Sequence, residues 1–213
     1  RSHERAIAAT QAGAFDTEIV PVAVTNEDGD TEMHKTDEGI RFDASLESIS
    51  GVKLLAEDGV ITAASASQIC DGASGVMIVN EDGLKKLGVK PLAKIIHLSV
   101  MGHDPVIMLE APIPATKRAL EKAGLSVDDI DVFEVNEAFG SIPVAFAKEL
   151  GVDEDKLNVH GGAIALGHPL GGSGTKLMAT LVNALQRKGG KYGLQTMCEG
   201  GGMANVTIIE NLQ

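Results

Sequence analysis

The order of predicted strands and helices after residue 71 is the feature that most limits what this chain can fold into. The predicted strands are 75–79, 93–98, 131–135, 194–197 and 204–209, and the helices between them are 81–87, 113–123, 141–150 and 174–187. Strands that alternate with helices of roughly 10–15 residues predict βαβ units and a mostly parallel sheet. The last two strands follow each other directly through a glycine-rich turn, which predicts an antiparallel pair at the end of the chain.

The first 70 residues are less regular. They predict a helix over 4–15 and a strand over 19–24, followed by an acidic stretch, 27–38, which has turn residues and no apolar periodicity. We expect that stretch to be a solvated loop. Because the sequence begins with Arg1, without a methionine and directly at the predicted helix, we also expect that a preceding segment was removed or lies on another polypeptide.

Composition excludes several classes of function. Lys and Arg number 18 against 30 Asp and Glu, so the formal charge is −12, which disfavours binding to nucleic acid or an anionic membrane. No apolar run approaches the roughly 18 residues of a membrane span, so no membrane insertion is expected. The two cysteines, Cys70 and Cys198, share no metal or disulfide spacing, and no histidine has a metal-ligand spacing. These features predict a cytoplasmic protein without a metal or a resident cofactor.

Three segments at the ends of predicted strands carry candidate chemistry. They are 136–139 (Asn-Glu-Ala-Phe), the glycine-rich 161–174 and 197–203, which contains Cys-Glu-Gly-Gly-Gly. The second is not a phosphate loop, because His168-Pro169 stands where a P-loop has Lys-Ser/Thr. A histidine, a thiol and an asparagine at neighbouring strand ends would suit acyl chemistry.

Each of these residues also has a purely structural interpretation. A lone histidine before proline is more often structural, a cysteine at a strand end is usually a small buried hydrophobe, and Asn136 could cap the following helix. Spacing alone therefore leaves the chemical and the structural interpretation open.

The three segments resemble, in order and spacing, the three C-terminal signatures of thiolases. The resemblance continues through Arg41, 65–67, 71–73 and 112–115, and so covers essentially the whole chain. It implies an α/β thiolase-like fold: a βαβαβαββ core domain with a mixed sheet and helices on both faces. The implied activity is CoA-dependent thiolysis of 3-ketoacyl-CoA or the reverse Claisen condensation of acyl-CoA thioesters, as in fatty-acid β-oxidation.

The resemblance also implies roles for single residues. His168 matches the family histidine that activates the nucleophilic cysteine and lines an oxyanion hole, and Asn136 matches the asparagine that holds a water in that hole. Cys198 matches the cysteine that moves the proton at Cα of the acetyl group, and Gly200 inherits an N–H of the second oxyanion hole. Arg41, Ser67, Ala138 and Phe139 match residues that hold CoA, which is a substrate here.

One family feature is absent. Thiolases carry the acyl-accepting cysteine in a C-x-S-G context that this sequence lacks, and Cys70 does not match that position, so we expect Cys70 to be a small buried side chain. The predicted organisation is part of the CoA-binding loop domain at 1–70, the last segment of the N-terminal core domain at 71–91 and the C-terminal core domain at 92–213. The expected partners are CoA and acyl-CoA, an N-terminal half bearing the nucleophile, and further copies in a homodimer or homotetramer.

Two other interpretations compete with this one. The chain could be a non-catalytic thiolase-fold fragment that binds only CoA or a partner chain. A ketoacyl-ACP synthase shares the fold, but such enzymes have a histidine where this chain has Asn136 and lack the C-terminal cysteine.

Overall fold

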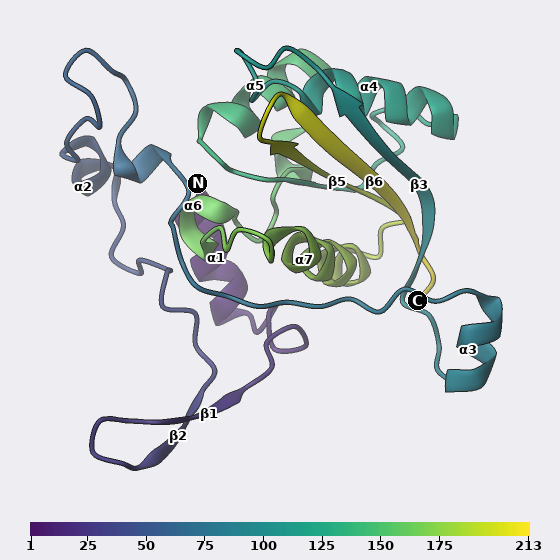
Figure 1. Ribbon diagram of the computed structural model, residues 1–213, viewed down its shortest axis with the longest axis horizontal. Coiled ribbons are helices and arrows are strands. Elements are labelled where there is room, and N and C mark those ends of the chain that lie inside the picture. Colours follow the sequence, from purple (N-terminus) through teal and green to yellow (C-terminus); the bar gives the residue numbers. More distant parts are fainter.

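The computed structural model describes all residues, 1–213, and its centre is a four-stranded mixed sheet in the order β3-β6-β5-β4 (Figure 1). The strands are β3 (Ala93–Gly102), β6 (Met203–Asn211), β5 (Tyr192–Glu199) and β4 (Val132–Val135). Only β4 and β5 pair in parallel, and β6 is antiparallel to both β3 and β5. The prediction of a mostly parallel sheet was therefore wrong. The tight turn after β5 returns the chain as β6, which lies between two strands that run in the same direction.

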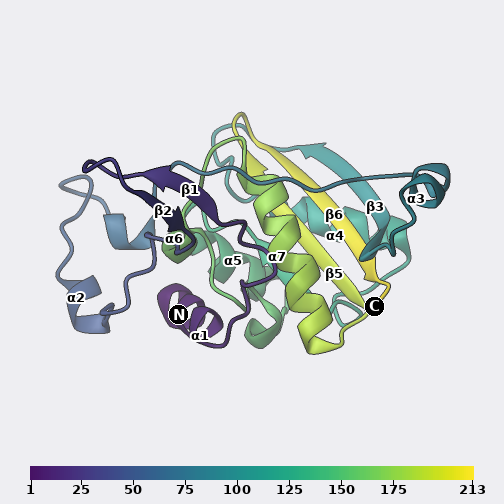
Figure 2. The same ribbon diagram turned by 90° about the horizontal axis from the view of Figure 1, so that it is seen from below.

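Helices cover both faces of the sheet, as expected (Figures 1 and 2). The larger buried cluster joins the sheet to α4 (Pro112–Ala123) and α5 (Ser141–Leu150), and includes Phe133 and Phe146 in an edge-to-face contact. The smaller cluster joins the other face to α7 (Ser173–Lys188) through residues such as Leu181 and Leu185. Alternation along β4 divides its side chains between these two layers, which buries the strand completely.

The βαβαβαββ order holds with one reduced member. Between α5 and α6 (Ala163–Leu166), the strand of the expected pattern is present as a single parallel bridge between Phe133 and Leu157. The helices predicted at 113–123, 141–150 and 174–187 correspond to α4, α5 and α7. No helix of the chain is both long and apolar enough to cross a bilayer.

Residues 1–70 lie beside the sheet domain. They form α1 (Ser2–Gln11), the hairpin β1 (Val22–Thr25) with β2 (Thr31–His34), and α2 (Leu46–Ser50). The acidic stretch was expected to be a loop, but it contains β2, because a hairpin with both faces exposed needs backbone pairing and no apolar alternation. Figure 2 shows this hairpin on the outside of the molecule.

The strand predicted at 75–79 is absent. The segment runs in an open path to α3 (Glu81–Leu87), and Met77 and Ile78 are 77% and 71% exposed (Figure 1). An apolar run becomes a strand only where a neighbour satisfies its N–H and C=O groups, and no strand of this chain lies beside it. The α3 helix itself forms as predicted, with the Asn80 side chain accepting from Gly83 N–H at its start.

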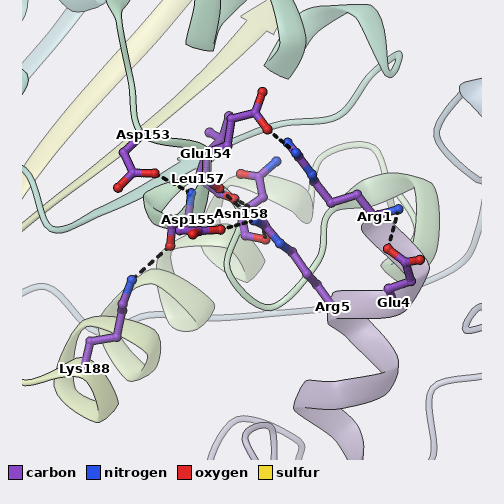
Figure 3. A network of polar contacts seen from close by, with 9 residues as sticks. All are labelled: Arg1, Glu4, Arg5, Asp153, Glu154, Asp155, Leu157, Asn158 and Lys188. Carbon is purple, nitrogen blue, oxygen red and sulfur yellow. Dashed lines mark hydrogen bonds and ion pairs between the residues drawn. The ribbon is translucent and has the colours of Figure 1, made fainter.

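A polar network attaches α1 to the segment between α5 and α6 (Figure 3). The Arg5 guanidinium donates to the carbonyl oxygens of Glu154 and Leu157, and Arg1 pairs with the Glu154 carboxylate. From the other side, Lys188 Nζ donates to the Asp155 carbonyl oxygen over 3.1 Å. Together these contacts fix the chain just before Asn158, which enters the site described next.

Candidate active site

Asn136 leaves the carboxyl end of β4, where parallel strands place their ligand sites. It is 2% exposed, and its N–H donates to the Thr196 carbonyl oxygen of β5 over 3.1 Å. Helix α5 begins five residues later, with Gly140 at its N-cap and no side-chain cap. Asn136 is therefore not a helix cap, and its amide Nδ2 instead lies 3.5 Å from His168 Nε2.

Asn158 holds the open edge of β4 next to Asn136. Its side-chain oxygen accepts from Val135 N–H over 2.8 Å, and its side-chain nitrogen donates to the Val135 carbonyl oxygen over 2.9 Å. The residue is 3% exposed and has a φ of 47°, a left-handed conformation that asparagine tolerates better than most residues. The Asn158 side chain thus makes the two hydrogen bonds that a neighbouring strand would otherwise make with Val135.

Glu137 connects β4 to the glycine-rich segment. Its carboxylate accepts from the Ile164 N–H over 3.1 Å and from the Ser2 hydroxyl over 2.7 Å. A side chain at Gly162 would overlap this carboxylate, so the close approach requires glycine there. Glu137 therefore fixes the start of α6, which leads to His168.

His168 is half-buried in the loop between α6 and α7. Ser173 Oγ donates to the Pro169 carbonyl oxygen over 3.0 Å and lies 2.5 Å from His168 Nδ1, so it accepts the Nδ1–H. Nε2 is then the free base, and it faces the Asn136 amide. Burial, with a smaller contribution from the Lys176 charge, lowers the pKa of His168, so the imidazole is neutral at neutral pH.

Cys198 lies near the end of β5, two residues beyond Thr196. Burial, with a smaller contribution from the neighbouring Glu199 carboxylate, raises the pKa of the Cys198 thiol, so it is protonated at neutral pH. The following turn exposes Gly200, while a side chain at Gly202 would overlap the backbone of Asp104. The β5–β6 turn therefore offers backbone N–H groups beside a neutral thiol.

Three of the four residues predicted to hold CoA lie together. Ser67 N–H donates to the Ala138 carbonyl oxygen over 3.1 Å, and Ala66 forms an antiparallel bridge with Phe139. Arg41 is exposed, and its guanidinium makes no hydrogen bond or ion pair within the chain. The fold brings Ser67, Ala138 and Phe139 against the end of β4, and leaves the Arg41 cation in solvent.

Cys70 differs from expectation. It is exposed rather than buried, and a side chain on Gly167 would overlap its sulfur. The position is exposed because residues 69–79 run along the surface without a layer above them.

Comparisons with known proteins agree with this geometry. Residues 89–211 match the family profile described as "Thiolase, C-terminal domain", and residues 1–82 match "Thiolase, N-terminal domain". The chain belongs to the thiolase family. Both the family prediction and the predicted fold class are thereby confirmed.

Individual thiolases show how much of such a protein the chain spans. It is 54% identical to the "Steroid 3-ketoacyl-CoA thiolase FadA6" of Mycobacterium tuberculosis, over 99% of this chain and 50% of that protein. The Bacillus anthracis acetyl-CoA acetyltransferase structure superposes with a TM-score of 0.92 at 37% identity, covering 100% of this chain and 54% of that one. The structure of human mitochondrial 3-ketoacyl-CoA thiolase in complex with CoA superposes with a TM-score of 0.88 at 40% identity, covering 99% of this chain and 52% of that one. The chain therefore spans about half the length of its thiolase relatives.

Sequence reasoning missed several residues of this candidate site. Ser173 sets the His168 tautomer, and Asn158 completes the β4 edge. The backbone carbonyl oxygen of Gln68 accepts from the His168 backbone N–H, and the Gln68 side-chain amide donates to the carbonyl oxygens of Gly39 and Ile164. Ser173 stands one helical turn beyond Pro169, a spacing that could have marked it. Nothing local in the sequence marks the other two, because their partners are distant along the chain.

Proposed function

We propose that the chain is the C-terminal portion of an acyltransferase that catalyses thiolysis of 3-ketoacyl-CoA by CoA, or the reverse Claisen condensation. In this proposal the nucleophilic cysteine comes from an N-terminal half outside this sequence. The observation that carries the proposal is the contact between Asn136 and the unprotonated Nε2 of His168 at the carboxyl end of β4.

His168 suits the role of base toward a thiol. Its Nδ1–H is held by Ser173 and its pKa is lowered, so Nε2 can accept a proton from the nucleophile at neutral pH. Once protonated, the same nitrogen becomes a donor beside the Asn136 amide. Two donors at one point can stabilise a thioester oxygen that gains negative charge.

Cys198 suits the proton step at Cα. Its raised pKa keeps a proton on sulfur, which a carbanion at Cα can take at the end of cleavage. In condensation the direction reverses, and the thiolate would remove that proton. The exposed N–H groups of the turn at Gly200 can hold the second carbonyl oxygen.

The CoA substrate would lie along Ser67, Ala138 and Phe139, with the free Arg41 cation meeting its phosphates. The CoA complex of the human relative is consistent with such a substrate. The proposal extends to a homodimer or homotetramer in the cytoplasm.

The test begins with intact-mass analysis of the native assembly, to find a companion polypeptide that contains C-x-S-G. If none is present, the N-terminal half of the Mycobacterium relative can be co-expressed with the chain. Thiolysis is then measured with short and long 3-ketoacyl-CoA for the wild type, His168→Ala, Cys198→Ala and the control His34→Ala on the exposed hairpin.

We expect His168→Ala and Cys198→Ala to lower turnover by about 10²–10⁴, typical of lost acid–base groups, and His34→Ala to leave it unchanged. Cys198→Ala should still accept an acyl group on the nucleophile. Asn136→Asp should fold normally but turn over at least tenfold more slowly, because it places negative charge beside a developing oxyanion. An assembly that binds CoA but shows no turnover would favour the non-catalytic fragment.

A further inference from the structure

Lys176 lies under the His168 loop and has no role in the chemistry described so far. It stands in the first turn of α7, and its Nζ donates to the carbonyl oxygens of Leu166 and Gly167 over 2.8 and 3.3 Å. These are the last two carbonyl groups before His168. A cationic donor on the carbonyl end of a helix is favourable, and here it closes the short α6.

The ammonium group is held in an unusual way for a charge inside a protein. No carboxylate lies within ion-pair distance of it, although buried charges are normally paired. Burial lowers the pKa of Lys176, and this shift is partly offset by the titratable groups near it on other elements, which are Asp37, Cys70, Glu134 and Glu18. Its only hydrogen-bond partners are the two loop carbonyl oxygens, so its donors are directed at the loop.

The surroundings of His168 contain no competing charge at contact distance. Asn136 faces the ring from β4, Ser173 from α7 and the Gln68 carbonyl oxygen from the preceding segment. The one charged group that perturbs the ring is Lys176, which acts together with burial to lower the pKa of His168.

We propose that Lys176 is the positioning residue for His168. Its two hydrogen bonds hold the loop that carries the imidazole, and its charge disfavours a second positive charge on that ring. The role of the imidazole as a base rests on the proposed function, whereas the hydrogen bonds that hold the loop do not depend on it.

Hydrogen–deuterium exchange read by mass spectrometry tests both parts on the purified assembly. Exchange at the imidazole C2 position, followed against pH, gives the titration midpoint of His168 and, at its plateau, the accessibility of the ring. Amide exchange over 164–172 reports how firmly the loop is held. The variants are Lys176→Met, Lys176→Arg and the control Lys148→Met, which removes an exposed lysine at the end of α5 whose ammonium group makes no hydrogen bond or ion pair.

Lys176→Met should raise the His168 midpoint and speed amide exchange in the loop. Lys176→Arg should restore both toward the wild type, because guanidinium keeps the charge and the donors, and Lys148→Met should change neither. In the active assembly Lys176→Met should lower kcat with little change in KM. An unchanged His168 midpoint in Lys176→Met would overturn the electrostatic part of the proposal, and unchanged amide exchange over 164–172 would overturn the part in which Lys176 holds the loop. An assembly without turnover would count against the proposed function alone, since the titration does not use activity.

Discussion

Removing the Asn158 side chain tests whether a single residue completes the edge of β4. In Asn158→Ala the N–H and C=O of Val135 lose their partners in a site that is 3% exposed. Each buried backbone group left unsatisfied costs about 1–3 kcal/mol, so the two together cost about 2–6 kcal/mol. That is a large part of the roughly 5–15 kcal/mol that stabilises a typical domain.

Two further variants divide that cost. Asn158→Gly loses the same hydrogen bonds but relieves the strain of a φ of 47°, so it should be about 1 kcal/mol more stable than Asn158→Ala. Asn183→Ala is the matched control. That side chain lies on α7 and donates to the Ala179 carbonyl oxygen, and its loss leaves no buried group unpaired.

The free energy of unfolding, measured by urea denaturation of the assembly, gives these differences, and amide exchange at Val135 locates them. We expect the Val135 amide to lose protection in Asn158→Ala while the amides of α7 keep theirs. A cost below about 1 kcal/mol for Asn158→Ala would refute the reasoning, because the edge groups must then find other partners.

Three other predictions follow from single features of the fold. Burial raises the pKa of Glu134 well above its usual value, so the folded state binds the carboxyl proton more tightly than the unfolded state does. The folded state therefore loses stability as pH rises and this carboxyl ionises. Glu134→Gln should flatten the fall in melting temperature with rising pH. Gly167 has a φ of 75° and a ψ of 164°, so Gly167→Ala should lower the free energy of unfolding by about 1–3 kcal/mol and displace His168. Both effects can be measured, as a lower melting temperature and as lower turnover. The chain expressed alone should aggregate, as read by light scattering, and Met77→Ser with Ile78→Ser should reduce that aggregation, because these side chains are exposed; a monodisperse wild-type chain would contradict this.

Local sequence determined most of the helices and the three chemical segments. Helix α5 begins and ends at the predicted residues, because its apolar period and the glycine after it are properties of neighbouring residues. The motifs at 136–139, 161–174 and 197–203 identified the family for the same reason. Each is a continuous run whose chemistry can be read without knowing its neighbours in space.

Pairing and burial were decided only by the tertiary structure. The run at 75–79 has the composition of a strand but no neighbour, and the acidic stretch lacks apolar alternation but pairs as β2. The position of β6 between β3 and β5 made the sheet mixed, although three of its four strands run in one direction.

The base form of His168 is a tertiary property as well. It depends on Ser173 at one nitrogen, Asn136 at the other and the Lys176 charge below the loop. The sequence named the histidine, but a tautomer and a shifted pKa arise from distances between groups, and burial sets how strongly those groups interact. Only folding brings β4 and α7 close enough to make that imidazole a base.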